Sequence, residues 1–286
     1  MRYFLDHLSF RYAWFRLRDY VRMLAFECRH FTVPHLGLLS VQVVDHCNLN
    51  CKGCSAYSPL AKEWYADVVQ IQKDLLELAK KVQFGQIVLI GGETLLHPQL
   101  TELVQIVKRI YPKASVVITT NGILLPKMSD DFWKVCNEER VLIIVSVYPP
   151  YQEKMSTYVE LARKNKVSVL PIFSSDVWKL LKNSPMGSGY SADKIFRKCP
   201  LKTCHRLYHS KLYLCQMCFL EHYNRYFNEN HETVKGYDIY KYSGKELVEF
   251  MKRPDPACRY CTWVMKNETT QWDYSKREKS EWCGDV

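Results

Sequence analysis

The sequence predicts an α/β fold with a mainly parallel sheet and a small C-terminal cysteine-rich extension, and three observations support it. Short runs rich in Val and Ile alternate with segments of helical periodicity. After the first run, apolar runs begin at residues 86, 115, 141 and 167, so their starts are 29, 26 and 26 residues apart, the length of one βα unit. A cysteine-rich segment follows these units. A β/α barrel and an open doubly wound sheet both satisfy this pattern.

The elements are expected in this order. Buried strands are predicted where β-branched residues cluster, at residues 41–44, 86–90, 115–119, 141–147 and 167–173. Amphipathic helices are predicted between them, at residues 66–82, 98–110, 129–139 and 151–165. Because ligands bind at the carboxyl ends of the strands in both architectures, the loops that follow the strands are the expected place of a functional site.

Composition narrows the class of protein. The 286 residues, 47% of them hydrophobic, can bury a sizeable core. No apolar run approaches the ~20 residues of a membrane-spanning helix, and the N-terminus mixes Arg, Asp and aromatic residues, so a cytoplasmic location with reduced thiols is expected. The formal net charge of +10 is spread along the chain. This disfavours nucleic acid as a partner and suits an anionic or polar small-molecule substrate.

The twelve cysteines fall into groups, and the first group is the most informative. Cys47, Cys51 and Cys54 follow the first predicted strand. Three thiolates leave a tetrahedral zinc site one ligand short, unless His46 or a distant residue completes it. A [4Fe–4S] cluster held by three cysteines instead keeps one iron open for a substrate or cofactor.

Two more motifs follow the next two predicted strands, "GGET" at residues 91–94 and "TNG" at residues 120–122. Either one alone could be an ordinary turn. In this order behind Cys47-x3-Cys51-x2-Cys54, they resemble the signature of the radical S-adenosylmethionine (radical SAM) superfamily. The resemblance covers about residues 41–173 and implies a partial (β/α)6 TIM-like barrel at residues 37–195.

The resemblance also implies roles for single residues. Cys47, Cys51 and Cys54 would hold a [4Fe–4S] cluster whose open iron binds S-adenosylmethionine. The glycines would let the backbone approach the cofactor, and the carboxylate would pair with its ammonium. The implied cofactor-binding residues are Gly91, Gly92, Glu93, Thr94, Asn121, Ser146 and Phe173. Gly53 stands where the family has an adenine-contacting aromatic; either Tyr57 replaces it or the adenine is held by another group. Thr94 stands where the family has Pro.

The second cysteine set can be interpreted in two ways. Cys215-x2-Cys218 and Cys258-x2-Cys261 could form a zinc site, although the gap between the pairs is unusually long. The set also resembles the twitch or SPASM-type extension of radical SAM enzymes. That resemblance implies a hairpin at residues 209–215 and an auxiliary [4Fe–4S] cluster on Cys199, Cys215, Cys258 and Cys261, with Cys204 as an alternative ligand.

The other cysteines and the chain ends complete the prediction. Cys204 and Cys218 are candidate hydrogen-atom donors, whereas Cys28, Cys136 and Cys283 are expected to be small buried residues. Residues 1–36 are expected to contain a basic amphipathic helix with Trp14, Leu17, Val21 and Leu24 on one face. Such a helix packs on its own domain or makes peripheral contact with a membrane. A twitch-like domain is expected at residues 196–265 and a tail at residues 266–286.

Three functional hypotheses follow. The first is a radical SAM enzyme that reductively cleaves S-adenosylmethionine to a 5′-deoxyadenosyl radical and abstracts a hydrogen atom from a small polar metabolite. A carbohydrate or nucleotide sugar is preferred, with dehydrogenation, epimerisation or elimination as the outcome and flavodoxin or ferredoxin as the electron donor. The second hypothesis transfers this chemistry to a peptide or partner protein. The third is a non-enzymatic iron–sulfur or zinc protein that binds nucleic acid, for which the strand-end motifs would have no role.

Overall fold

The structure is a computed structural model that describes residues 32–173, 177–179, 188–215, 235–262, 264–265 and 269–282, with Leu17, Val21, Arg22 and residues 24–30. Its main element is an eight-stranded sheet with the order β5-β4-β3-β2-β1-β7-β8-β9. Strand pairs from β5 to β7 are parallel, and those from β7 to β9 are antiparallel. The strands are β1 (His35–Val44), β2 (Gln83–Gly91), β3 (Ser115–Thr120), β4 (Leu142–Val147), β5 (Ser168–Phe173), β7 (His205–Tyr208), β8 (Lys211–Tyr213) and β9 (Tyr237–Asp238).

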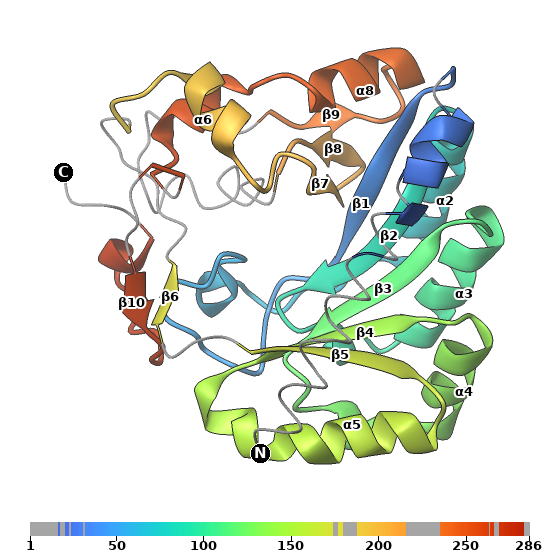
Figure 1. The fold of residues 1–286 in the computed structure, drawn as a ribbon, viewed down its shortest axis with the longest axis vertical. Helices are drawn as coiled ribbons and strands as arrows, with labels where there is room; N and C mark the ends of the chain where they lie inside the picture. The colour runs from blue at the N-terminus through green and yellow to red at the C-terminus, as the bar shows by residue number, and fades with distance from the viewer. Residues whose placement is uncertain are drawn as a thin grey trace.

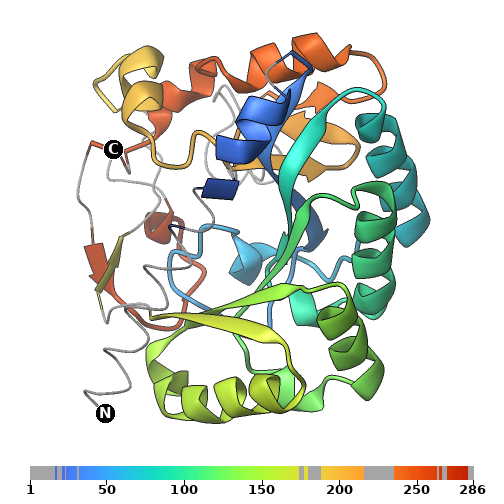
Figure 2. The ribbon, with the colours of Figure 1, turned by 45° about the vertical axis from the view of Figure 1, so that its right-hand side comes forward.

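Four amphipathic helices lie along the outer side of the parallel strands (Figures 1 and 2). Asp67 accepts a hydrogen bond from the backbone N–H of Gln70, and Ser129 accepts one from Phe132. Such caps fix the residue at which a helix begins. The helices are α2 (Val68–Ala79), α3 (Leu100–Ile110), α4 (Asp130–Glu138) and α5 (Met155–Lys164).

Shorter elements surround this framework. Helices α6 (Ala192–Lys198) and α8 (Gly244–Met251) belong to the C-terminal third of the chain. Strand β6 (Val177–Lys179) pairs antiparallel with β10 (Thr269–Gln271), and this ribbon stands apart from the main sheet (Figure 1). Short 3-10 segments occupy Ser58–Leu60, Thr94–Leu96, Leu125–Lys127, Pro149–Lys154, Pro256–Tyr260 and Lys279–Glu281.

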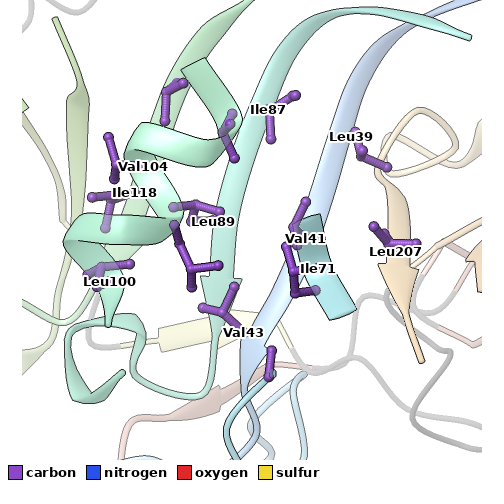
Figure 3. Close-up of a cluster of buried hydrophobic side chains, with 14 of the residues drawn as sticks. Leu39, Val41, Val43, Ile71, Ile87, Leu89, Leu100, Val104, Ile118 and Leu207 are labelled. Carbon is purple, nitrogen blue, oxygen red and sulfur yellow. The ribbon is translucent and has the colours of Figure 1, made fainter. Parts of the chain in front are cut away.

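The hydrophobic core lies between the sheet and these helices. Alternate strand residues face one side of a sheet, so Leu39, Val41 and Val43 of β1 lie in one row that is fully buried. Figure 3 shows this row beside Ile87 and Leu89 of β2, with helix residues packed over both strands. The intervening residues of β1 face the other side of the sheet, and they include the buried polar side chains of Ser40 and Gln42.

The prediction of an α/β fold with a mainly parallel sheet is confirmed. Strand β1 begins at His35, earlier than predicted, because its first residues pair with β2 from Gln83 onward. The next strand of the main sheet after β5 is β7, and it joins the opposite edge, beside β1. The barrel of six β/α units and the separate boundary at residue 196 therefore remain predictions.

The predicted hairpin in the second cysteine segment is present but longer than expected. It joins β7 to β8 through His209 and Ser210, whose φ angles are 47° and 58°. Two successive left-handed residues match the twist of a two-residue hairpin turn. Near the other end of the chain, Val21, Arg22 and residues 24–30 are helical. Within the described residues, no helix is both long and apolar enough to span a bilayer.

Candidate active site

The carboxyl ends of β1 and β2 touch through their backbones. The N–H of Gly92 donates to the carbonyl of Val44 at 2.8 Å, and the N–H of Glu93 donates to that of His46 at 3.0 Å. A Cβ on Gly92 would lie 2.2 Å from the carbonyl oxygen of His46, and one on Gly91 would lie 2.3 Å from that of Val44. Both positions therefore require glycine, because a side chain would collide with the backbone of the cysteine loop. The sequence did not suggest this requirement.

Glu93 lies fully buried between the ends of β2 and β3. Its carboxylate accepts hydrogen bonds from the hydroxyl of Thr120 at 2.6 Å and from the backbone N–H groups of Asn121 and Leu95 at 2.8 and 2.9 Å. Burial raises the pKa of this carboxyl, and the three donors oppose the rise. Because these donors are neutral, the arrangement suits a positively charged ligand group that would balance the carboxylate.

Asn121 joins the end of β3 to the cysteine loop. Its side-chain nitrogen donates to Oδ1 of Asn48 at 2.7 Å and lies 3.7 Å from Sγ of Cys47. The backbone N–H of Leu49 donates to the same sulfur at 3.3 Å. Hydrogen bonds to cysteine sulfur tune the potential of an iron–sulfur cluster. Sequence reasoning missed Asn48 because a single Asn beside a cysteine gives no signal of its own.

The three thiols of the loop influence one another. Burial raises the pKa of Cys47 to about 12, with Glu93 and Cys54 adding to the rise. Burial also raises the pKa of Cys51, and both other thiols contribute. Among the described residues, no three His, Cys, Asp or Glu side chains converge on the position of a single metal ion. A four-iron cluster makes a different demand, since its thiolates bind separate corners.

Residues 272–282, for which the sequence predicted only a tail, pack against the cysteine loop. Backbone hydrogen bonds join Lys52 to Asp273 at 2.9 Å and Ser275 to Asn50 at 2.8 Å. The indole N–H of Trp272 donates to Sγ of Cys51 at 3.4 Å. The C-terminal residues therefore form part of the candidate site and reach one of its sulfurs directly.

The end of this segment holds the second half of the loop. The N–H of Gly53 donates to Glu281 at 3.3 Å, and the indole of Trp282 donates to the carbonyl of Cys54 at 2.8 Å. Gly53 has a φ of 62°, which favours glycine over an aromatic residue there. The ring of Tyr57 is fully buried and stacks on Trp282 with centroids 5.9 Å apart. Tyr57 is thus a core residue, which favours the alternative that another group contacts the adenine.

Tyr148, directly after β4, is a further residue of interest, to which the sequence assigned no role. Burial raises the pKa of its hydroxyl, and the three loop thiols and Glu93 raise it further, so Tyr148 lies close enough to feel their charge. Ser146, the predicted ribose contact, lies half-buried on the same face of β4. Phe173 ends β5, and its side chain lies outside the described residues. Thr94 is buried with no hydrogen-bond partner for its hydroxyl among the described residues.

A buried polar network ties β7 to the base of the cysteine loop. Asp45 accepts hydrogen bonds from the hydroxyl of Tyr208 at 2.6 Å and from the side chain of Gln42 at 2.9 Å. Arg206 donates to Gln42 at 2.7 Å. Since Asp45 precedes Cys47 by two residues, the hairpin fixes the position of the loop. The neighbouring His46 accepts the backbone N–H of Trp64 at its Nδ1 atom, at 3.3 Å.

Several thiols of the second cysteine set influence one another. Burial raises the pKa of Cys258 to about 12, and the nearby Asp255, Cys261 and Cys199 raise it further. Burial likewise raises the pKa of Cys204, with a contribution from Cys199. Cys215, which follows β8, packs at the edge of the core. Cys199, Cys258 and Cys261 therefore lie near one another, with Cys204 beside Cys199.

The remaining cysteines differ in their surroundings. Cys136 is buried in α4, as predicted. Cys28 is exposed, so the expectation that it is buried is wrong, because the apolar face that carries it points to solvent. Cys218 and Cys283 lie outside the described residues. The candidate role of Cys218 as a hydrogen-atom donor and the expected burial of Cys283 therefore stay predictions.

A family model agrees with the geometry of the site. The model described as the Radical SAM superfamily matches residues 41–158, which contain the cysteine loop, Glu93 and Asn121. Residues 41–158 form a radical SAM domain. The family implies a [4Fe–4S] cluster and S-adenosylmethionine. The side chains of this domain fit both groups, with three gathered thiols and a buried carboxylate that lacks a cationic partner among the described residues.

Curated relatives and a solved structure are similar to this chain. The GTP 3′,8-cyclase of Alkaliphilus oremlandii (strain OhILAs) is 25% identical over 135 residues, 46% of this chain and 40% of the relative. That of Chlorobaculum tepidum is 38% identical over 90 residues, 32% of this chain and 27% of the relative. The chain thus spans less than half the length of either relative. The crystal structure of BtrN in complex with AdoMet and 2-DOIA has a TM-score of 0.54 at 19% identity, covering 84% of this chain and 98% of that one, which shows a shared fold.

Proposed function

We propose that this chain is a radical SAM enzyme that abstracts a hydrogen atom from a small polar metabolite. A bound [4Fe–4S] cluster with S-adenosylmethionine supplies the chemistry, in which one electron cleaves the sulfonium and the resulting 5′-deoxyadenosyl radical takes the hydrogen. The observation that carries the proposal is the meeting of Cys47, Glu93 and Asn121 at the ends of three consecutive strands. A nucleic-acid-binding protein has no need for this arrangement.

The side chains have distinct tasks in this proposal. Cys47, Cys51 and Cys54 provide thiolates for three irons. Glu93, held by its three donors, balances the ammonium of the cofactor. The loop closed by the C-terminal segment excludes water and oxygen from the site. The other candidate cofactor contacts are Gly91, Gly92, Thr94, Asn121, Ser146 and Phe173.

The proposed substrate class is a small polar or anionic metabolite, such as a carbohydrate or nucleotide sugar. The net charge of +10 suits an anion. The names of the relatives point to a nucleotide, which belongs to the same broad class. Dehydrogenation, epimerisation and elimination are the proposed alternatives for the outcome, with flavodoxin or ferredoxin as the electron donor in a cytoplasmic setting.

An auxiliary cluster is the proposed role of the second cysteine set. The proximity of Cys199, Cys258 and Cys261 supports it, with Cys215 as the fourth ligand and Cys204 as an alternative to Cys199. A thiol that is not used for iron, such as that of Cys204, is then available as a hydrogen-atom donor to a substrate radical.

The decisive experiment compares wild type with the Cys47→Ala/Cys51→Ala/Cys54→Ala variant after anaerobic reconstitution, with Cys28→Ala as a control for loss of a lone thiol. About eight irons are expected in wild type and about four in the triple variant, with 5′-deoxyadenosine released under reductant only by wild type and the control. Addition of sugars, nucleotides or peptides then identifies the class that accelerates release. Equal iron contents, or no release by wild type, would refute the proposal.

A further inference from the structure

A cavity of about 370 Å³ opens at the edge of the sheet opposite the cysteine loop. Its floor is formed at the amino ends of β2 and β3 by Gln86 and Ser115. One wall comes from the helical residues Arg22, Ala25, Phe26, Arg29 and His30. Since the candidate active site lies at the carboxyl ends of the same strands, this cavity is a separate site. We refer to it as the basic pocket.

The helical wall of the basic pocket is docked by specific contacts. The ring of Phe26 packs over Gly85, so that a Cβ on that glycine would lie 3.2 Å from the ring. Glu27 pairs with Nε2 of His35 at 2.5 Å, at the start of β1. The ring of Phe26 also packs edge-on against that of His35 in β1, with centroids 5.8 Å apart. These contacts hold the segment against the sheet and leave the cavity between them.

The charge of the basic pocket is strongly one-sided. Five cations and one carboxylate line it, an excess of four positive charges: Arg22, Arg29, Lys108, Lys113, Arg140 and Glu139. In the described part of the chain, none of the five cations forms an ion pair with a carboxylate. Lys108 lies in the last turn of α3, where a cation complements the helix dipole, and Arg140 lies two residues beyond the end of α4. The remaining three come from the N-terminal helical segment and the loop before β3.

We propose that the basic pocket binds a phosphate-bearing anion. Guanidinium groups match phosphate oxygens in geometry and charge, and lysines add point charges. A bound anion would offset the repulsion among cations that otherwise face one another across a partly enclosed space. The volume accommodates a pyrophosphate or a phosphorylated headgroup, and the position at the far edge of the sheet allows binding without competition with the proposed cofactor.

The phosphate could belong to a free metabolite or to a lipid headgroup. The apolar face of the N-terminal helical segment distinguishes these two sources. Leu17, Val21 and Leu24 lie on one face of the helical segment, and each exposes about half of its side chain, 54%, 54% and 47%. An exposed apolar face beside cations is typical of helices that lie on an anionic membrane. A lipid source needs this face, whereas a free phosphate does not.

The test is calorimetric titration of inorganic pyrophosphate into the reconstituted protein, with iron content measured afterwards to verify that no iron was removed. The pocket variant Arg29→Gln/Lys113→Gln removes two exposed pocket cations. The control variant Lys134→Gln/Lys164→Gln removes two exposed cations of α4 and α5. The pocket variant should bind at least about tenfold more weakly, because each charged hydrogen bond contributes substantially. The control should bind like wild type.

Flotation with vesicles, either phosphatidylcholine alone or mixed with phosphatidylglycerol, identifies the source. Binding to the anionic vesicles that is lost in both the pocket variant and Val21→Ser/Leu24→Ser supports a lipid headgroup. Pyrophosphate binding without vesicle binding supports a free phosphate metabolite. Absence of pyrophosphate binding by wild type, or equal weakening in the pocket and control variants, would overturn the proposal.

Discussion

Single hydrogen bonds link residues that are far apart in the chain to the candidate cluster. The bond from Trp272 to the sulfur of Cys51 joins residues separated by 221 positions. In the proposed enzyme this sulfur would be an iron ligand, and a hydrogen bond to it stabilises the reduced, more negative cluster. Trp272 is therefore a positioning residue whose effect is measurable as a potential.

Replacing Trp272 by Phe keeps an aromatic ring and removes only the N–H. The potential of the cluster should become more negative by about 20 to 60 mV, since one hydrogen bond contributes about 0.5 to 1.5 kcal/mol and 59 mV corresponds to a tenfold change for one electron. Redox titration followed by electron paramagnetic resonance measures the shift. Tyr274→Phe is the matched control, because this neighbouring side chain is exposed. An unchanged potential in the Trp272 variant would contradict the assignment.

Glu93→Gln tests the proposed ammonium contact. The change removes the negative charge while the side chain keeps its size, so affinity for S-adenosylmethionine should fall about 10- to 100-fold, the loss of one charged hydrogen bond. Iron content should stay at the wild-type level, because Glu93 ligates no iron in the proposal. Calorimetry measures the affinity, and Glu102→Gln on the exposed face of α3 is the control. Unaltered affinity would assign the ammonium to another group.

At the scale of elements, His97 lies just before α3, and its two hydrogen bonds hold its ring in one protonation state. Its Nε2–H donates to the carbonyl of Ala66 at 2.9 Å, and its Nδ1 accepts the backbone N–H of Gln99 at 3.1 Å. Burial lowers the pKa of His97. A second proton would have to sit on Nδ1, where it would face the N–H of Gln99.

This arrangement predicts how stability depends on pH. The folded-state pKa lies below the unfolded value of about 6.5, so the unfolded chain binds more protons below that pH and the free energy of unfolding falls as the solution becomes more acidic. His97→Gln should lower stability at pH 7 and make it less dependent on pH below about 6.5. Urea denaturation at a series of pH values measures both effects. The same slope in variant and wild type would exclude His97 as the source.

The elements that the sequence predicted best are those with a strong local period. The strands at residues 115–120 and 168–173 agree with prediction to within a residue at each end, because runs of β-branched residues between helices leave little choice of boundary. The start of β1 was missed because His35–Ser40 contains Gly and Ser among its apolar residues, so that its strand pattern is weak. Its pairing with β2 and β7 makes it a strand.

At the scale of the whole molecule, the C-terminal segment completes both the core and the site. Trp282 is among the largest fully buried side chains, and it packs on Tyr57 of the cysteine loop. Trp282→Ala should lower the free energy of unfolding by about 3 to 5 kcal/mol, the cost of removing a large buried side chain. Guanidinium denaturation measures the loss.

Tyr274→Ala, at an exposed position of the same segment, is the control and should change stability by less than about 1 kcal/mol. Equal effects of the two substitutions would mean that the segment is not an integral part of the core. The Trp282 variant should also incorporate less iron, because the carbonyl of Cys54 would lose its indole donor.

The sequence by itself determined the α/β class and the resemblance to radical SAM domains. Strand periodicity, Cys47-x3-Cys51-x2-Cys54, GGET and TNG are local patterns, so they can be recognised without knowledge of contacts. Only the tertiary structure decided what surrounds the cysteine loop. Residues 272–282 show no helical or strand periodicity in the sequence. Their hydrogen bonds to Lys52, Gly53 and Cys54 join residues more than two hundred positions apart. The basic pocket was equally hidden, because its cations come from separate segments that only folding brings together.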